Sequence, residues 1–309
     1  MNVKSVSLPM NLHRLDLVSL ALFVRVLRTG SISKGAERAH LALAAASRRI
    51  ADLEEAVGSP LLERHSRGVR ATAAGEALLA HAQRILGEVD RLAADLSDHA
   101  RGVVGVVRLW ANTSAVTQFL PGDLAAFSAQ HPRVRIELHE RDSSEVVMAV
   151  LDGRAEIGIF AERVDPLGLQ TRVYRRDRLV LVVPKGHPLA RRRRVSLDEV
   201  VGHDFVSLSQ GTSLAQRLAA EAGALGAALR VRVHVRSFDA MCQMVAARLG
   251  IAVLPLDAVQ PHIRSMGLVR VDLAGDWIHR ELLIGIRNAD RLSKSGRLML
   301  AHLEEAALA

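Results

Sequence analysis

The sequence has little cysteine and no long hydrophobic run. A single Cys among 309 residues excludes a disulfide framework and a cysteine-rich zinc site, and it indicates a reducing compartment. No apolar stretch approaches the roughly 18 residues that a membrane-spanning helix needs. The apolar run 17–24 has the length of a secretory signal core, but Asp16 precedes it, Arg25 and Arg28 follow it, and no small-residue cleavage pattern comes next. We therefore expect a soluble cytoplasmic protein that has no membrane partner.

Catalytic motifs are missing as well. The thirteen His include no HExxH pair, and no GxxxxGK[ST] phosphate loop is present. Cys242 lies in an amphipathic stretch with Met241 and Met244, which favours a place in the core over a role as a nucleophile. The sequence therefore predicts no enzymatic activity, no catalytic residue, no metal and no cofactor.

The charge that is present is mostly arginine. With 49% hydrophobic and 24% charged residues, the composition is that of a globular protein, and the length suits two or three domains. The net charge is +8 and the pI is about 10.7. Because the planar guanidinium of Arg pairs well with phosphate or carboxylate, these values favour an anionic partner. The run of four Arg at 191–194 is expected to be a solvated loop.

Three short helices are expected near the N-terminus. The first spans 15–29, and the second follows Ser31 or Ser33, each of which is a suitable N-cap. The third spans about 42–57 and ends at Gly58. Its apolar residues share one face: Ala46, Ile50, Leu53 and Val57. The second and third helices together predict a crossed pair that enters a groove of DNA.

A two-stranded ribbon and a long helix should come next. The segment LLERHSRGVRATAAG, residues 61–75, alternates in the manner of a ribbon or wing, and Thr72 can cap a helix of about thirty residues. The apolar residues of this helix step by four and three, which is typical of a heptad seam that needs a partner helix. They are Leu78, Ala82, Ile85, Val89, Leu92 and Leu96. The alternative is a long helix lying on its own domain.

From residue 102 onward, short β-like runs alternate with amphipathic helices. This pattern predicts a parallel α/β sheet. Because there are too many strands for one mononucleotide-type sheet, we expect two α/β lobes.

At this point the sequence resembles the LysR-type transcriptional regulators along nearly its whole length. The resemblance rests on RTGSISKGAERAHLALAAASRRIADLEEAVGSPLLERHSRGVRATAAGEALL, then LVLVVPKGHPLA, then MVAARLGIAVLP. It implies an α + α/β architecture with a winged helix-turn-helix at 12–72, a dimerising linker helix at 73–101 and an effector-binding region at 102–309. That region should resemble type 2 periplasmic binding proteins. Two crossover strands should join lobe 1, at 102–162 and 268–309, to lobe 2, at 163–267.

Two departures from the family pattern stand out. Where the family commonly has a Ser-Gln-Pro run at the start of the recognition helix, this chain has Ala42, Leu43 and Ala44. The loss of a Ser N-cap costs ~1 kcal/mol, which the Ala-rich run partly offsets, and a Gln that reads a base edge is absent. Arg248 occupies a place where the family usually has Gly.

The predicted DNA surface combines small apolar and basic side chains. A helical wheel places Leu43, Ala44, Ser47 and Arg48 outward, so that thymine methyl groups and guanine or phosphate become the expected contacts, with DNA shape contributing the rest. Arginines of the wing suit backbone phosphate. The complete predicted set is Ser33, Lys34, Leu43, Ala44, Ser47, Arg48, Arg49, Arg64, Arg67 and Arg70.

The predicted effector site has two parts. The first is a helix start at Asn112, Thr113 and Ser114, whose free N–H groups suit an anionic ligand, although Ser114 alone would serve equally as an N-cap. The second is the segment 207–213, which is either a polar loop or the opposite wall of an interlobe cleft. From it we select Ser207, Gln210, Gly211 and Ser213, with apolar walls from Phe160, Phe238 and Val253, each of which is equally suited to the core.

These patterns, together with the resemblance to the LysR-type regulators, lead to one expectation and one rival. The expectation is a transcription regulator that forms dimers or tetramers and binds double-stranded DNA and a small-molecule effector in the interlobe cleft. The rival is a ligand-binding or catalytic α/β protein with an accessory N-terminal domain. The missing catalytic motifs count against the rival.

Overall fold

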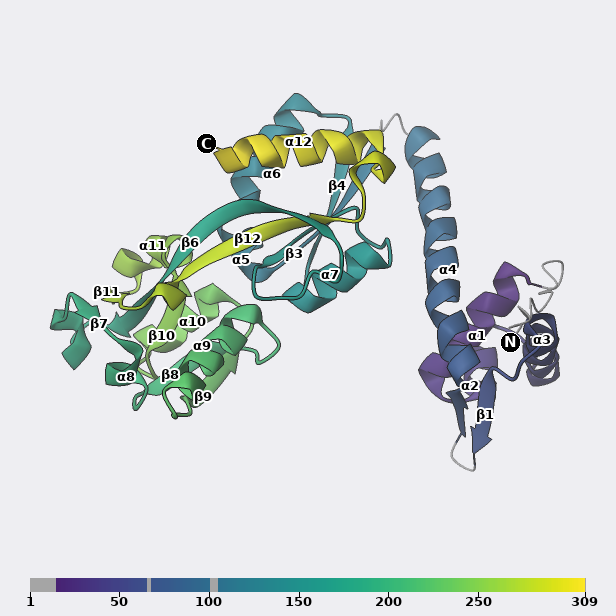
Figure 1. The fold of residues 1–309 in the computed structure, drawn as a ribbon, viewed down its shortest axis with the longest axis horizontal. Helices are drawn as coiled ribbons and strands as arrows, with labels where there is room; N and C mark the ends of the chain where they lie inside the picture. The colour runs from purple at the N-terminus through teal and green to yellow at the C-terminus, as the bar shows by residue number, and fades with distance from the viewer. Residues whose placement is uncertain (1–14, 66–67, 101–104, 309) are drawn as a thin grey trace, which may run out of the picture. The chain divides into compact units, whose positions relative to one another are not determined.

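The protein folds into two compact units, residues 1–97 and 98–309. The computed structural model describes residues 15–65, 68–100 and 105–308, without the side chains at 90, 91, 93–100 and 291. Figure 1 shows the helices and strands of each unit with the labels used below. In the described ranges, no helix is both long and apolar enough to cross a membrane.

The first unit opens with three helices, as predicted. They are α1 (Leu17–Thr29), α2 (Ile32–Arg38) and α3 (Leu43–Val57). Asp16 caps α1 by accepting from the Ser19 N–H, and Ser31 caps α2 by accepting from the Lys34 N–H. Gly30 and Gly58 end α1 and α3 in the left-handed conformation. The core of this unit is apolar and includes Leu20, Phe23, Ala46, Ile50 and Leu53.

The predicted ribbon is present as β1 (Leu62–His65) and β2 (Gly68–Ala71), paired antiparallel. The Val69 N–H donates to the Gly30 carbonyl at 2.9 Å, which anchors the ribbon to the turn between α1 and α2. Gly68 has a φ of +136°, and a Cβ there would stand 2.2 Å from the Gly30 oxygen. Only Gly therefore permits this close approach.

The long helix α4 spans Ala73–Ala100, and its start is stabilised by Thr72, whose Oγ1 accepts from the Gly75 N–H at 3.0 Å. Ala82 is fully buried in the core of its own unit, and Leu78 packs against that core. Ala82 is therefore not available to a partner helix, which corrects the predicted seam. The exposed apolar side chains lie further along α4, at Ile85, Val89 and Leu92, which are 38%, 38% and 59% exposed. The side chain of Leu96 lies outside the described residues.

The second unit contains two α/β lobes, as predicted. The first lobe holds three central strands in the order β4-β3-β5, of which both pairs are parallel. The antiparallel strand β12 completes it, so the sheet is mixed and not wholly parallel. Its elements are β3 (Gly105–Ala111), α5 (Thr113–Gln118), α6 (Leu120–Gln130), β4 (Val134–Glu140), α7 (Ser143–Leu151), β5 (Ile157–Ala161), β12 (His279–Ile286), η4 (Ala289–Arg291) and α12 (Lys294–Leu308).

The second lobe packs around a separate apolar core. Its strands β10 and β11 pair antiparallel with the end of β6, and β8 pairs parallel with β9. Its elements are η2 (Pro188–Arg191), β7 (Arg194–Val195), α8 (Leu197–Val200), β8 (Asp204–Leu208), α9 (Ser213–Ala224), β9 (Arg230–Val235), α10 (Phe238–Ala246), β10 (Ala252–Pro255), α11 (Leu256–Ser265), β11 (Leu268–Leu273) and η3 (Asp276–Ile278).

The long strand β6 (Gln170–Pro184) connects the two lobes and belongs to both. Its first half pairs with β12, and its second half pairs with β10 and β11 (Figure 1). Residues 268–278 carry apolar side chains that pack in the core of the second lobe, although the sequence analysis placed them in the first. Tyr174, on the first half of β6, packs in the core of the first lobe, so both predicted lobe boundaries shift.

Candidate functional site

The outer face of α3 presents the side chains that the helical wheel selected. Leu43 is 53% exposed, and Ala44 and Arg48 are exposed, whereas Ser47 is half-buried. The N-cap residue Ala42 makes no side-chain hydrogen bond, so the first-turn N–H groups of α3 lack a capping side chain. The outer face of α3 therefore combines two exposed apolar side chains in its first turn, an N-terminus without a capping side chain and the exposed guanidinium of Arg48.

Arg49 has a structural role in addition to its place beside this face. Its Nη1 lies 3.2 Å from an Asp16 carboxylate oxygen and 3.2 Å from the Ser19 hydroxyl. Because Asp16 caps α1, these contacts tie α3 to the start of α1. Arg49 therefore helps to fix the orientation of α3, while the side chain of Arg48 is exposed to solvent.

The remaining predicted DNA contacts are exposed where the structure describes them. Arg64 and Arg70 lie on the two strands of the ribbon, and Ser33 and Lys34 lie in the first turn of α2. Arg67 lies outside the described residues. Guanidinium groups on such a ribbon suit contact with a phosphate backbone, which positions a protein without reading sequence.

A pocket lies between the two lobes of the second unit. The first lobe contributes two short segments, 112–114 and 141–143, and the second lobe contributes Leu208 and the segment 212–214. The predicted residues Asn112, Thr113, Ser114 and Ser213 all line it. The two segments that were predicted to face one another across a cleft are thus brought together.

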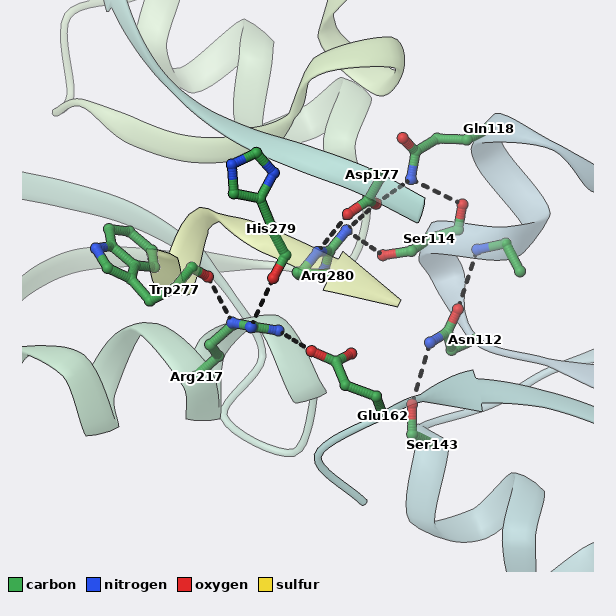
Figure 2. Close-up of polar contacts among 11 residues, drawn as sticks. Asn112, Ser114, Gln118, Ser143, Glu162, Asp177, Arg217, Trp277, His279 and Arg280 are labelled. Carbon is green, nitrogen blue, oxygen red and sulfur yellow. Dashed lines mark hydrogen bonds and ion pairs between the residues drawn. The ribbon is translucent and has the colours of Figure 1, made fainter. Parts of the chain in front are cut away.

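Asn112 holds the first wall of this pocket in place. Its Oδ1 accepts from the Ala115 N–H at 3.0 Å, which caps α5, and its Nδ2 donates to the Ser143 hydroxyl at 3.1 Å (Figure 2). Asn112 therefore supplies the cap that the sequence analysis considered for Ser114. One amide side chain thereby joins the start of α5 to the start of α7.

Ser114 contacts a buried ion pair. Arg280 on β12 donates from Nε to Asp177 on β6 at 2.7 Å, and its Nη2 lies 3.3 Å from the Ser114 Oγ (Figure 2). The side chains of Arg280 and Asp177 are 2% and 1% exposed. Gln118, also on α5, donates to Asp177 at 3.1 Å. The wall of the pocket is thus hydrogen-bonded to the strands that connect the lobes.

A second arginine fixes the opposite wall. Arg217 on α9 donates to the backbone carbonyls of Trp277 and His279 at 2.8 and 2.9 Å, and it pairs with Glu162, which follows β5 (Figure 2). Glu221, which is also on α9, forms an ion pair with Arg163 at 2.8 Å. The helix whose first turn lines the pocket is therefore tied both to the connecting strand and to the first lobe.

Asp142 brings a carboxyl group into the pocket. It is the N-cap residue of α7 but makes no side-chain cap hydrogen bond, and its Oδ2 lies 2.6 Å from the place that a Cβ on Gly211 would occupy. Burial and the nearby Glu145 raise the pKa of Asp142 above its usual range. The pocket therefore offers a hydrogen-bond acceptor as well as donors.

Several predicted effector residues lie elsewhere. Phe160, Phe238 and Val253 are at most 2% exposed and pack in the apolar cores, so none supplies a pocket wall. Ser207 is buried within β8, and Gln210 is exposed but does not line the pocket. Gly211 does not line the pocket, although a Cβ added there would meet Asp142, which does.

Other lining residues were not selected from the sequence, although Leu208 and Thr212 lie within the predicted segment 207–213. The residues not selected are Arg141, Asp142, Ser143, Leu208, Thr212 and Leu214. Residues 141–143 could have been found from their position directly after β4. Because β3 and β4 are parallel, their carboxyl ends lie at the same edge of the sheet, so the residues that follow each strand are close together. Among the described residues, no group of three or more His, Cys, Asp or Glu could hold a metal ion.

Comparison with known protein families decides the classification. The model of the LysR substrate binding domain matches residues 100–308, and the model of the bacterial regulatory helix-turn-helix protein, lysR family, matches residues 17–76. This chain belongs to the LysR family. Members of the LysR family are DNA-binding transcriptional regulators, and the match covers both units.

Individual relatives agree with this assignment to the LysR family. The chain is 26% identical to the RuBisCO operon transcriptional regulator of Allochromatium vinosum over 279 residues, which are 90% of this chain and 92% of the relative. The crystal structure of CbnR, a LysR family transcriptional regulator, matches with a TM-score of 0.69 and 22% identity over 95% of this chain and 99% of that one. The CcmR regulatory domain of Synechocystis PCC6803 in complex with 2-PG matches with a TM-score of 0.61 and 20% identity, over 66% of this chain and 97% of that one. These relatives are regulators and not enzymes.

Proposed function

We propose that this protein regulates transcription in the cytoplasm by binding double-stranded DNA with α3 and the ribbon, under the control of a small molecule bound between the two lobes. The observation that carries the proposal is the pocket, because it joins 112–114 of one lobe to 212–214 of the other. A ligand that contacts both walls favours one lobe arrangement over another, and that preference shifts the population of conformations.

The DNA contacts divide into two kinds. Leu43 and Ala44 suit thymine methyl groups in the major groove, and Arg48 suits guanine or phosphate. Arg64 and Arg70 suit phosphates alone. Because every neutralised phosphate releases counterions, binding to duplex DNA should weaken steeply as salt rises.

Fluorescence anisotropy with a labelled duplex of random sequence tests the electrostatic part. We expect Arg70→Ala to weaken binding to all DNA sequences alike. It should also lower, by about one, the slope of the logarithm of the binding constant against the logarithm of the salt concentration. Arg264→Gln, which removes an exposed charge from the second unit, should leave both quantities unchanged. Binding that is flat between low and moderate salt would rule out the proposed phosphate contacts.

The chemistry of the pocket defines the class of effector. The hydroxyl groups of Ser114 and Ser213, with the guanidinium of Arg141, offer donors to an acidic group. The Thr113 hydroxyl instead donates to Glu140 at 2.6 Å, and the Thr212 hydroxyl donates to the Ser209 carbonyl at 2.9 Å. The Asp142 carboxyl accepts a hydrogen bond from a donor on the same ligand. We infer a small acid that also carries a hydroxyl or amine. The structure of the CcmR regulatory domain in complex with 2-PG supports a small-molecule ligand in a domain of this fold.

Thermal unfolding with a panel of small carboxylic and hydroxycarboxylic acids, and separately with 2-PG, tests this assignment. A ligand that binds only the folded protein raises Tm by mass action. Ser213→Ala removes a pocket hydroxyl and should reduce the ligand-induced rise without changing Tm in its absence. Ser265→Ala on α11 is the matched control, because its hydroxyl bonds only carbonyls of its own helix. Equal ligand-induced rises in both variants would place the ligand elsewhere.

Ser114→Ala is a second variant with a different expected signature. Its hydroxyl lies against Arg280, so the substitution removes an acceptor from a buried guanidinium as well as a ligand contact. We expect a lower Tm without ligand and a smaller ligand-induced rise. A ligand contact to a charged partner at this position is worth about 1.5 to 3 kcal/mol, or roughly ten- to hundred-fold in affinity.

The proposed regulator acts as a dimer or a tetramer. Two helix-turn-helix units are needed to contact two half-sites about one helical turn apart. The exposed apolar residues Ile85, Val89 and Leu92 of α4 are the proposed contact with a second copy of the chain.

A further inference from the structure

A second hollow lies on the second lobe and shares no lining residue with the pocket between the lobes. Four separate segments form it: the turn after β6, the start of β8, strand β9 and the end of α10. The residues that matter are Gly186, His187, His203, Asp204, Arg232 and Arg248. The hollow therefore gathers two guanidinium groups and two imidazoles around one carboxylate.

Arg248 holds a backbone conformation that favours Gly. Its φ is +62°, and the Leu249 N–H donates to the Met244 carbonyl at 3.1 Å, so Arg248 is the left-handed residue that closes α10. A side chain at such a position costs conformational free energy that Gly would not. Strain of this kind persists where the surrounding structure or a function requires the side chain.

The guanidinium of Arg248 is directed to the hollow. A Cβ on Gly186 would lie 4.0 Å from its Nη2, across the hollow from α10. Within the part of the chain that the structure describes, this guanidinium has no hydrogen bond or ion pair with a protein group. Its five donors are therefore available to a ligand.

The two histidines add donors. The imidazole rings of His187 and His203 lie 5.3 Å apart between centroids. The His187 Nδ1 accepts from the Leu189 N–H at 3.2 Å, so the ring proton is assigned to Nε2, which is left as a donor. Burial and the neighbouring His203 lower the pKa of His187, consistent with a neutral ring.

The net positive charge of the second lobe also favours an anionic ligand. Residues 178–278, which form the second lobe, contain thirteen Lys and Arg and eight Asp and Glu, an excess of five positive charges. The carboxylate of Asp204, which lies in the hollow, forms ion pairs with the guanidinium groups of Arg230 at 3.2 Å and Arg232 at 3.7 Å. An anion entering the hollow thus meets cations that its single carboxylate only partly neutralises.

We propose that this hollow is a second ligand site, which binds a small oxyanion such as the phosphate or carboxylate group of a metabolite through Arg248, Arg232 and His187. The site is separate from the proposed effector pocket, and its test does not depend on that pocket. Arg248 supplies a charge-assisted fork, Arg232 is held in place by Asp204, and His187 donates from its ring.

The experiment measures thermal unfolding of the full-length protein in inorganic phosphate, against chloride at equal ionic strength. Phosphate should raise Tm saturably in the parent protein. Arg248→Gln keeps the side chain but removes the charge, and the apparent Kd for phosphate should rise by about tenfold or more. Arg248→Gly should show the same loss, together with a higher Tm than the parent in chloride because the strain is relieved. Arg264→Gln, an exposed charge on α11, should keep the full response.

Three results would overturn the proposal. An equal phosphate response in the parent and both Arg248 variants shows an adventitious effect. A response that never saturates shows exclusion of phosphate from the surface and not binding. A loss of duplex DNA affinity in Arg248→Gln, with the phosphate response intact, assigns the surface to DNA. The same titration with malonate distinguishes a carboxylate site from a phosphate site. The proposal requires that at least one of these two anions binds.

Discussion

Arg280 and Asp177 lie directly opposite one another on the two strands that connect the lobes, and their side chains form a fully buried ion pair. The next pair along the same strands, Arg176 and Glu281, is exposed, with Nε and Oε1 2.9 Å apart. The pair at 177 and 280 also contacts Ser114 and Gln118 of α5. The strand connection is therefore coupled to the pocket wall by buried polar contacts, and not by packing alone.

Arg280→Met should destabilise the second unit by about 3–5 kcal/mol, because it leaves an uncompensated buried carboxylate. Chemical denaturation measures this cost. Arg176→Met is the matched control, since it removes an exposed partner from the adjacent pair and should cost less than about 1 kcal/mol. Replacing both Arg280 and Asp177 with apolar residues should restore most of the lost free energy of unfolding. Equal effects of the two single variants would contradict the account of the buried pair.

Leu92→Asp should dissociate the oligomer, because a charge placed in an apolar helix contact is costly. Sedimentation velocity measures the effect, and Gln83→Asp, an exposed position on the same helix outside the apolar set, is the control. A Leu92 variant that sediments like the parent would remove this part of α4 from the proposed interface.

Asp142→Asn should stabilise the protein at neutral pH. The folded pKa of Asp142 is raised, so the charged form is disfavoured in the fold, and stability falls as the pH rises through the unfolded value of 3.8 toward the folded one. The variant lacks this penalty at all higher pH values and should match the parent near pH 3. Denaturation curves at several pH values measure the difference. A variant that is less stable than the parent at pH 7 would show that the carboxylate has a stabilising partner.

Cys242 should be unreactive in the folded protein. It is fully buried on α10, and burial raises the pKa of its thiol to about 11, with Asp239 as a further cause. We expect a thiol reagent to label it at pH 8 only after denaturant opens the second lobe. Because the chain has one Cys, the labelling rate reports that opening alone. Fast labelling of the native protein would contradict the packing of α10.

The sequence was most informative where structure depends on local pattern. The caps at Ser31 and Thr72, the helix end at Gly58 and the apolar face of α3 follow from residue type and spacing, and the predicted three helices and ribbon are confirmed. The cap at Asp16 was not predicted, because the first helix was expected to begin at residue 15. The start of α5 at Asn112 is of the same kind, since a strand was followed by a short polar cap.

The parts that were missed depend on contacts between distant residues. Arg280 and Asp177 are 103 residues apart, and only the register of β6 and β12 brings them together. Phe160 lies in a strand that is buried on both faces, so alternation could not distinguish a pocket wall from the core. The heptad pattern of α4 likewise could not show that Ala82 packs on its own unit.

The most direct measurement of the central claim is selection of DNA from a pool of random duplexes by the full-length protein. The account predicts an enriched site with two related halves about one helical turn, or a multiple of it, apart. It also predicts that Arg48→Ala loses this preference while the folded second unit still responds to its ligand. A pool that remains random after selection, or a site equally enriched by the Arg48 variant, would contradict recognition of DNA by α3.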